Sequence, residues 1–440
     1  MRWRVTSDTA PPPETSPLRI ANFRAYWTAR LTMTLAQYAM MLIIGWQTYN
    51  IARDGGMGVA EASGQLALIG LLQFVPLFLL TPFSGWAADH FDRRNLGRLT
   101  VLLQLVCAAV LAWLTWNDAI TLRWIFGVAV LLGIARAFAG PALSALAPNL
   151  VPKAILPNAI ALSSISWQVG MIAGPALGGY LYAVFPALPY LAAVGLFLIS
   201  ITALSLIGKV EQPPRAINQR PIHAMVEGLR YVVRNKMVLG AITLDLFAVF
   251  LAGATALFPV YARDILEVGE TGLAQLAMAP AVGATLTALF FSFRPLKTNV
   301  GPKMLWAVAL FGLATIVFGL SKSMPLSLAM LFIVGAADMF SVYIRQSLIQ
   351  LHTPDEKRGR VSSVSLLTIS ASNEFGDFFS GSLAYAIGPV AAVVSGGVGA
   401  LITVAAWTGL FPVLRKTRTF DPPDELNEQT PQTKLQEQTP

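Results

Sequence analysis

Long, almost uninterrupted apolar runs alternate along the chain with short polar segments. Each run is long enough for a helix to cross a bilayer, which takes about 20 residues. Transmembrane β-strands would instead alternate apolar and polar positions over about ten residues. The pattern therefore predicts an all-α integral membrane protein with twelve transmembrane helices, near residues 22–50, 62–88, 96–116, 122–148, 158–183, 188–208, 238–261, 272–293, 302–321, 326–350, 361–385 and 389–414.

Composition supports this prediction and narrows the chemistry. Of 440 residues, 55% are hydrophobic and only 12% are charged, about half the charged share of soluble domains. So few charges would not cover the surface of a soluble fold of this size. A single cysteine and three histidines argue against a disulfide framework, a metal centre and His-based catalysis. We expect no metal, no cofactor and no catalytic residues.

Lys and Arg residues are distributed unevenly between the two sides that alternating spans define. If both termini are cytoplasmic, the external loops hold only Arg53, Arg123, Arg263 and Lys322, and most of the 31 basic residues lie in the tails and internal loops. This asymmetry predicts that both termini are cytoplasmic. The net charge of +8 then reflects topology and contact with anionic membrane lipid, and we expect no nucleic-acid partner.

The longest internal loop divides the chain into two sets of six helices. Residues 22–208 would form one bundle and residues 238–414 the other, after a cytoplasmic tail of residues 1–21. The linker, 209–237, contains an amphipathic helix suited to the inner membrane interface. Residues 415–440 are polar and aperiodic and are predicted to form a disordered cytoplasmic tail.

The two halves also resemble each other. Sliding the sequence by 202 positions superposes the fourth helix on the tenth and the fifth on the eleventh. Parallel repeats of this kind are the architecture of many secondary transporters. We therefore predict two pseudo-symmetric six-helix bundles, on the matches Gly133 with Gly335, Pro152 with Pro354, Gly174 with Gly376, and Gly179 with Gly381.

The loop after the second helix reads GWAADHFDRR. It resembles the cytoplasmic loop signature of the major facilitator superfamily, although His90 replaces a usual Arg or Lys and Asp92 replaces a Gly. In that family the loop latches the two halves together on the cytoplasmic side in the outward-facing state. The resemblance implies the same role for the matching residues. The alternative is that the loop is basic only because internal loops generally are. The matching residues are Gly85, Asp89, Arg93 and Arg94.

The fifth helix carries GMIAGPALGG. Glycines four residues apart form one face that a second helix can approach closely, and the proline permits a bend. The order resembles the antiporter motif of the superfamily, which is associated with exporters rather than symporters. The alternative is simple small-residue packing. The motif residues are Gly170, Gly174, Pro175, Gly178 and Gly179.

Seven ionisable residues lie at membrane depth, where they are costly and usually functional. The repeat offset places Arg136 opposite Asp338. In the superfamily the first, fourth, seventh and tenth helices line the central cavity, and an Arg of the fourth helix is implicated in proton coupling. Arg30 and Asp245 also lie at the same depth in the first and seventh helices. The resemblance implies that arginines of one half face aspartates of the other across the path and exchange partners as the cavity changes access; the alternative for Arg136 is a structural ion pair. The seven are Arg30, Arg136, Asp245, Asp338, Arg345, Glu374 and Asp377.

An uncompensated buried carboxylate can take up a proton, and Glu374 and Asp377, three residues apart, would share one as a like-charge pair. It is equally consistent with the sequence that Asp377 faces water or outer headgroups. Polar side chains at membrane depth need partners, which makes Gln47, Gln168 and Tyr343 candidates for the cavity wall.

Residues 18–415 are similar to the enterobactin exporter and transmembrane secretion effector branch of the superfamily, most specifically in NFR at 22–24 and PDEKRGRV at 354–361. The resemblance implies a monomeric, multi-pass exporter of the bacterial inner membrane. It would move a small hydrophobic or amphipathic molecule, siderophore or drug-like, by proton antiport and alternating access. An uptake symporter on the same fold and, less favoured, a polytopic membrane enzyme are the alternatives.

Overall fold

The computed structural model describes residues 16–152, 155–208 and 221–420. Regular structure in these ranges is helical. The first bundle contains α1 (Ala21–Asp54), α2 (Val59–His90), α3 (Arg93–Trp116), α4 (Leu122–Leu146), α5 (Leu156–Val184) and α6 (Leu188–Leu206), with the short turns η1 (Pro17–Arg19) and η2 (Ala147–Asn149).

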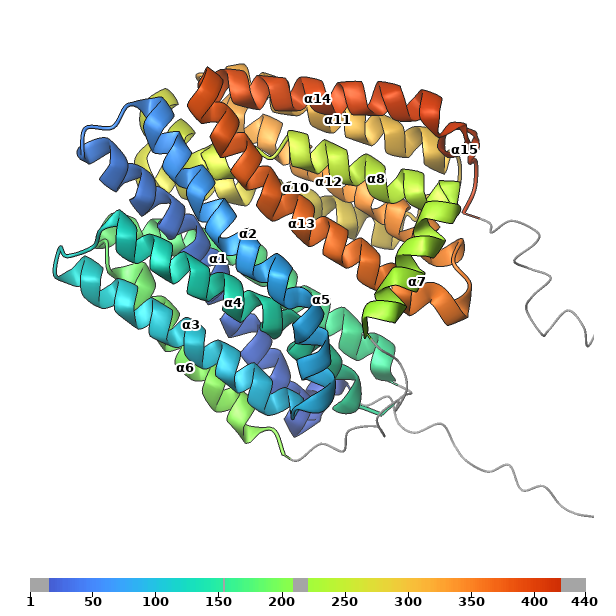
Figure 1. Ribbon diagram of the computed structural model, residues 1–440, viewed down its shortest axis with the longest axis horizontal. Coiled ribbons are helices and arrows are strands. Elements are labelled where there is room, and N and C mark those ends of the chain that lie inside the picture. Colours follow the sequence, from blue (N-terminus) through green and yellow to red (C-terminus); the bar gives the residue numbers. More distant parts are fainter. Residues whose placement is uncertain (1–15, 153–154, 209–220, 421–440) are drawn as a thin grey trace, which may run out of the picture.

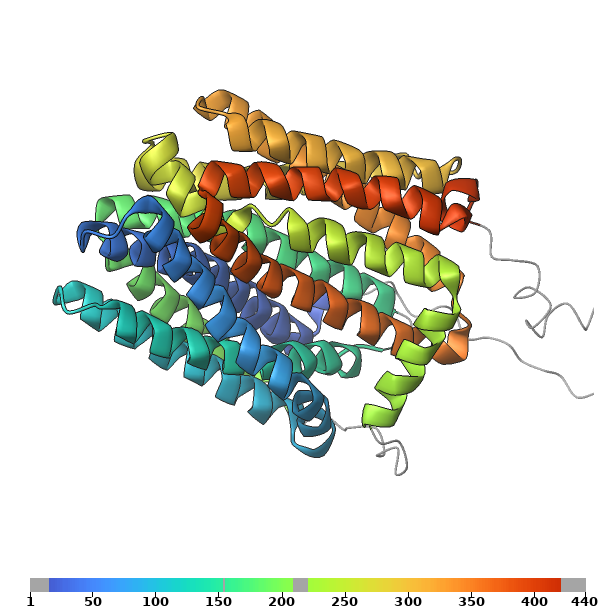
Figure 2. The same ribbon diagram turned by 45° about the horizontal axis from the view of Figure 1, so that its top comes forward.

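The second bundle begins with α8 (Lys236–Leu251), which is followed by three short elements, η4 (Thr255–Leu257), α9 (Phe258–Val260) and η5 (Tyr261–Ile265). It continues with α10 (Gly269–Phe293), α11 (Val300–Leu320), α12 (Met324–Leu351), α13 (Asp355–Ile387), α14 (Pro389–Leu410) and α15 (Pro412–Lys416). Between the bundles lies α7 (Pro221–Arg234). Figures 1 and 2 show the two bundles side by side, with α13 lying against α2.

The predicted fold class is confirmed. Within the described part of the chain, ten helical segments are long and apolar enough to cross a membrane, one of them the broken segment Lys236–Ile265. The other two predicted spans are α1 and α13, which have 34 and 33 residues and so are long enough. They carry more polar residues than the ten, and each packs between several neighbouring helices instead of lying at the edge of its bundle.

Three apolar cores hold the molecule together. One lies within α1–α6 and one within the second bundle. The third joins the bundles at the end that carries the α1–α2 loop, where Trp46 and Tyr49 of α1 pack with residues such as Phe258, Tyr261 and Phe318. We call this end the predicted outer end, following the charge distribution. Burial of apolar surface therefore closes the path between the bundles at that end.

Glycines of the predicted repeat mark equivalent close approaches in the two bundles. A Cβ at Gly133 of α4 would lie 2.5 Å from the carbonyl oxygen of Gln73 in α2, and Gly335 of α12 presses in the same way on the carbonyl of Pro280 in α10. Gly179 and Gly381 both stand at contacts between the bundles, against Ala274 of α10 and Ala67 of α2 respectively. The sequence repeat thus corresponds to a pseudo-symmetric packing scheme.

The other glycines of α5 form the seam between α5 and α1. A Cβ at Gly170 would lie 2.7 Å from Cβ of Thr34, and one at Gly178 would lie 2.8 Å from the carbonyl oxygen of Ala39. This face therefore packs within the first bundle, while the adjacent Gly179 contacts the second.

We expect Gly174→Ala to destabilise the protein by about 1 to 3 kcal/mol, because the new methyl group would lie 2.6 Å from Cβ of Tyr38 and would force the two helices apart. The matched control is Gly195→Ala in α6, where an added Cβ meets nothing within 4 Å and helix propensity favours Ala by up to about 1 kcal/mol. Thermal unfolding in detergent measures both. Equal melting temperatures for the two variants would contradict the close-packed seam.

The predicted disordered tail begins too early. Residues 415–416 continue α15, and the chain then returns to the start of α11, where Val300 and Gly301 donate from their backbone amides to the carbonyls of Arg418 and Thr417 at 3.3 and 3.1 Å. The first amides of a helix have no partner within it, so this segment satisfies them. Residues 421–440 lie outside the described residues, as do residues 1–15 of the predicted tail 1–21 and linker residues 209–220.

The predicted amphipathic linker helix is α7, and one of its faces is docked on α13. Glu227 pairs with Arg360 at 2.5 Å, and the Tyr231 hydroxyl donates to the carbonyl of His352 at 3.0 Å. The opposite face leaves Val226 and Leu229 exposed. In both views α7 runs across the end of the second bundle (Figures 1 and 2). Its contact with the membrane interface stays a prediction.

Candidate transport cavity

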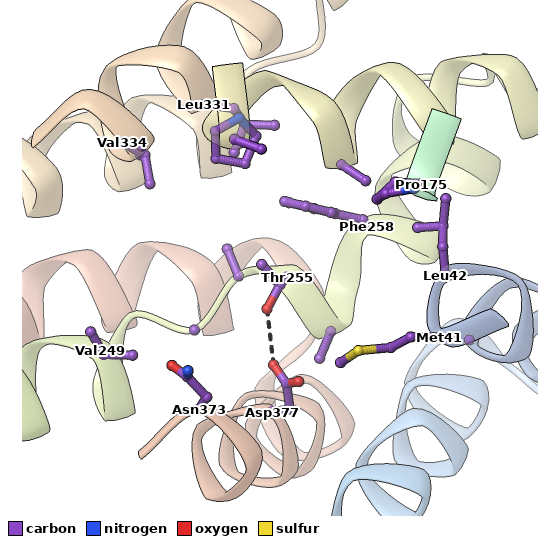
Figure 3. A pocket seen from close by; sticks show the side chains of 18 of the residues that line it. Met41, Leu42, Pro175, Val249, Thr255, Phe258, Leu331, Val334, Asn373 and Asp377 are labelled. Carbon is purple, nitrogen blue, oxygen red and sulfur yellow. Dashed lines mark hydrogen bonds between the residues drawn. The ribbon is translucent and has the colours of Figure 1, made fainter. Parts of the chain in front are cut away.

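A cavity of about 470 Å³ lies between the two bundles, a size typical of sites for drug-sized ligands. The walls come from both halves: α1, α2, α4 and α5 on one side, and the second bundle from α8 to α13 on the other. Most of the lining is apolar, as Figure 3 shows for Met41, Leu42, Phe258, Leu331 and Val334. Such a surface suits a ligand with a large apolar part.

A few polar groups converge on this apolar cavity, the arrangement typical of ligand sites. Among the described lining residues, the charged ones are one arginine and two aspartates, so carboxylates outnumber the cation. The polar lining residues are Tyr38, Gln73, Arg136, Thr255, Thr315, Asp338, Asn373 and Asp377.

Arg136 and Asp338 reach the same cavity from opposite bundles. Each stands three residues after a repeat glycine, Gly133 in α4 and Gly335 in α12, whose close contact with a neighbouring helix fixes the height of the charged side chain. The Arg136 guanidinium donates through Nη1 to Oε1 of Gln73 at 3.0 Å. The polar groups of the cavity therefore come in part from each half, and the role of both charges in coupling stays a prediction.

The seventh span is broken where it lines the cavity. Helix α8 ends at Leu251, the chain is non-helical over residues 252–254, and Thr255 begins η4. The sequence analysis expected a continuous helix over 238–261. Gly253 lies against Gly376 of α13, where two glycines let the backbones meet, and Pro259 cannot donate a helical hydrogen bond. These residues were the available signal for the break.

The break places Thr255 beside Asp377. The Thr255 hydroxyl donates to Oδ1 of Asp377 at 3.0 Å, and both side chains lie at the cavity beside Asn373 (Figure 3). Asp377 also lies where α13 meets α2 of the other bundle. A Cβ added to Gly70 of α2 would be 3.5 Å from the Cβ of Asp377. This carboxylate therefore faces the cavity and not the outer headgroups. The side chain of Glu374, its predicted proton-sharing neighbour, lies outside the described residues.

Asp245 and Arg345 pair with each other inside the second bundle. Nη1 of Arg345 contacts Oδ2 of Asp245, and the two side chains are 3% and 8% exposed. This corrects the expectation that Asp245 faces an arginine of the other bundle across the path. The reason is packing: α8 and α12 are neighbours in the same bundle, so the nearest compensating charge for a buried carboxylate is in its own half.

We expect Asp245→Ala to destabilise the protein by about 3 to 5 kcal/mol, because it leaves the Arg345 guanidinium buried without its counter-ion. The double variant Asp245→Leu with Arg345→Met removes both charges and should recover most of that loss. Thermal unfolding in detergent reports the two effects. A single variant as stable as the wild type would contradict a structural role for the pair.

Four other candidates lie away from the cavity lining. Gln47 is bonded inside the first bundle, donating to Thr115 and accepting from the Tyr190 hydroxyl. Arg30 donates to the hydroxyl of Tyr26 on its own helix at 2.8 Å. The remaining two, which also do not line the cavity, are Gln168 on α5 and Tyr343, whose ring stacks on Phe291. Residue type at membrane depth does not indicate which neighbour a side chain faces.

The predicted latch loop is anchored within the first bundle in this conformation. Asp92 caps α3, accepts from the backbone amide of Arg94 and pairs with its guanidinium at 2.7 Å. This hydrogen-bonded guanidinium lowers the pKa of Asp92 below its ordinary value. Arg94 also donates to the carbonyl of Ile207 at 3.1 Å, and Arg93 begins α3. The side chain of Asp89 and the surroundings of Gly85 lie outside what the structure describes.

At the predicted outer end, two arginine–aspartate pairs cross between the bundles, a feature that the sequence analysis missed. Arg53 binds Asp264 through two contacts of 3.0 and 3.3 Å, and Arg263 binds Asp54 at 2.6 Å. Asp264 also accepts from the Tyr49 hydroxyl. We call Arg53, Asp54, Arg263 and Asp264 the outer clasp. The sequence contains a feature that could have indicated it: the tripeptide Ala-Arg-Asp occurs at 52–54 and again at 262–264.

Known proteins resemble the chain along most of its length. A family model described as transmembrane secretion effector matches residues 13–439. The multidrug efflux pump Tap of Mycobacterium tuberculosis (strain ATCC 25618 / H37Rv) is 28% identical over 350 residues, which are 76% of this chain and 78% of the pump. The enterobactin exporter EntS of Escherichia coli O1:K1 / APEC is 24% identical over 412 residues, 90% of this chain and 97% of the exporter.

Solved structures show the same arrangement of helices. A bacterial homologue of the human lysosomal transporter Spinster, in an inward-facing and unoccupied conformation, superposes with a TM-score of 0.68 at 16% identity, over 93% of this chain and 100% of that chain. A D-xylose–proton symporter superposes with a TM-score of 0.68 at 12% identity, over 89% of this chain and 98% of that one. At these identities the likeness concerns the fold.

Proposed function

We propose that this chain, which belongs to the transmembrane secretion effector family, exports a small amphipathic molecule across the membrane by proton antiport and alternating access. The observation that carries the proposal is the cavity between the bundles, which is apolar over most of its wall and receives charged groups from both halves. A cargo bound there would contact both bundles, so that their relative movement would change the side from which it is accessible.

The conformation supports a cargo path that begins on the side of the tails. Apolar packing and the outer clasp hold the bundles together at the end of the α1–α2 loop. If both termini are cytoplasmic, as the basic residues predict, this is the inward-facing state. An exporter loads its cargo in that state, after which the clasp has to open for release.

Proton coupling is assigned to the carboxylates of the cavity. Two aspartates and one arginine line it among the described residues, and a carboxylate without a full counter-charge in an apolar surrounding accepts a proton readily. We infer that Asp338 is the principal acceptor, because its side chain lines the largely apolar cavity from α12. The Asp377 carboxylate already accepts a hydrogen bond from the Thr255 hydroxyl, so Asp377 would be the secondary proton acceptor.

The cargo class follows from the cavity and from the relatives. The lining offers extended apolar walls with few polar contacts, which fits a lipophilic or amphipathic molecule better than a sugar. Relatives named as a multidrug efflux pump and an enterobactin exporter support drug-like molecules and siderophores as the first compounds to test. We propose a bacterial inner-membrane location with both termini cytoplasmic and a monomeric transporter.

The test uses purified protein in liposomes that contain a pH-sensitive dye, with an imposed proton gradient and a panel of lipophilic drugs and catecholate siderophores. Antiport predicts cargo movement and proton movement in opposite directions, abolished by a protonophore. Cargo and protons moving in the same direction would show the alternative, uptake symport. Cargo movement without any proton flux would overturn coupling and leave the buried charges a structural role. Empty liposomes provide the baseline for leak.

A further inference from the structure

A second hollow, of about 590 Å³, lies on the outside of the first bundle, between α1 and α6 and away from the transport cavity. The walls include large apolar side chains that nothing in the described structure covers: Leu206 is 73% exposed, and Leu198 and Ile199 are 49% exposed. The lining residues are Ala21, Arg24, Ala25 and Thr28 of α1 with Leu198, Ile199, Thr202, Ala203 and Leu206 of α6. We call this hollow the α1–α6 groove.

Hydrogen bonds hold the α1–α6 groove open in a fixed shape. On the deeper side the Ser200 hydroxyl donates to the carbonyl of Ala29 at 2.9 Å, and just past the end of α6 the Gly208 amide donates to Oδ1 of Asn22 in the first turn of α1 at 3.1 Å. Between these two clamps the facing positions are mostly small, so the helices touch without filling the space. A ligand would therefore enter a preformed groove, and little ordering of the protein would oppose binding.

The groove is apolar along its length and cationic at one end. Arg24, its charged lining residue, is exposed one turn from the start of α1, and Arg19 is exposed in the η1 turn that precedes the helix. The first amides of a 34-residue helix add partial positive charge at the same place. A basic site between membrane helices beside apolar walls is complementary to an anionic lipid headgroup with its acyl chain.

We propose that the α1–α6 groove binds a phospholipid with an anionic headgroup, with its phosphate at Arg24 and an acyl chain along Leu198 and Ile199. This goes beyond transport of cargo, since the groove is separate from the cavity. The bound lipid would contact the first two turns of α1, and so stabilises the start of the helix that carries Met41 and Leu42 into the cavity.

The test compares retention of phosphatidylglycerol and phosphatidylcholine on the purified full chain by native mass spectrometry. Arg24→Gln should weaken phosphatidylglycerol binding about fivefold, the effect of removing one basic contact at a membrane surface, and leave phosphatidylcholine unchanged. The matched control is Arg123→Gln, an exposed arginine at the opposite end of the bundle, which should change neither. Equal losses for Arg24→Gln and Arg123→Gln would overturn the site.

A phosphatidylglycerol with a photoreactive acyl chain locates the lipid. Its adducts should map to peptides of α1 and α6, including residues 198–206. Adducts confined to other helices would overturn the proposal. Inorganic phosphate that displaced the lipid at equal concentration would show an anion site with no use for an acyl chain, and labelling that appeared only after deletion of residues 2–15 would show that the chain covers its own groove. Both results would also overturn it.

Discussion

Replacing Arg53 and Arg263 by Gln is expected to move the transporter toward conformations that are open at the predicted outer end, and to slow transport severely. Arg53 makes two contacts with a half-buried Asp264, and hydrogen bonds to charged groups contribute more when they are shielded. The Arg263 pair contributes less free energy, because Asp54 is largely exposed and solvent screens the pair. A combined loss of about 2 kcal/mol would shift the conformational equilibrium about 30-fold.

Distances between spin labels at the outer end measure this shift. The single native cysteine, Cys107, is buried in the first bundle and is replaced by Ser, after which Gly58→Cys and Thr271→Cys place one exposed label on each bundle. The arginine variants should populate a longer distance than the wild type. Because the clasp must reform in every cycle, we expect the transport rate to fall at least about tenfold.

Charge exchange provides the control for the clasp. Arg53→Asp combined with Asp264→Arg restores opposite charges across the bundles and should recover the shorter distance in part, whereas either change alone places like charges together. Arg123→Gln removes an exposed arginine at the same end and should have no effect. If the arginine variants kept the wild-type distance distribution, the apolar contacts of the third core would be sufficient for closure and the clasp would be dispensable.

Asp338→Asn is expected to abolish proton-coupled transport, with a loss of about 100-fold or more, and to leave folding intact. The side chain lines the cavity from α12, so an uncharged group of the same shape disturbs no packing, but it cannot bind and release a proton. Initial rates of cargo-dependent lumenal pH change in liposomes measure the loss. The wild-type rate should depend on pH, and the residual rate of the variant should not.

The matched control for this substitution is Asp118→Asn, an exposed turn residue whose left-handed backbone Asn also accepts; it should transport at the wild-type rate. Arg136→Lys keeps the opposing charge and should retain more activity than Arg136→Gln. Exchanging the charges, Arg136→Asp with Asp338→Arg, distinguishes a direct pair from two separate roles, since only a direct pair predicts recovery. Full proton coupling in Asp338→Asn would transfer the acceptor role to Asp377.

Sequence patterns predicted the helices well because crossing a bilayer demands length and apolarity, which are local properties. They did not predict the break after Leu251, because the broken segment is as apolar as an intact one and the contact between Gly253 and Gly376 joins distant residues. The twelve spans were therefore predictable, whereas Gly253 and Pro259 marked a weak point in the seventh span without fixing where it breaks.

The candidate site shows the same division. Arg136 and Asp338 could be placed opposite each other because a repeat relates their positions, whereas no symmetry argument applied to Gln47 or Tyr343. In a membrane helix both the lipid-facing and the buried sides are apolar, so periodicity does not identify the face. The pairing of Asp245 with Arg345 was missed because pseudo-symmetry suggests partners in opposite halves, while packing supplied one in the same half.

The polarity of α13 has a consequence for biogenesis. This helix carries Asn373, Glu374 and Asp377 near its centre. Its insertion into lipid alone would be unfavourable by several kcal/mol, because each charged residue at a helix centre opposes insertion by about 3 kcal/mol. In the folded protein α13 lies against α8 and against α2 of the other bundle. Its stable integration therefore depends on the first bundle being already in the membrane, so the second half is not an independent folding unit during synthesis.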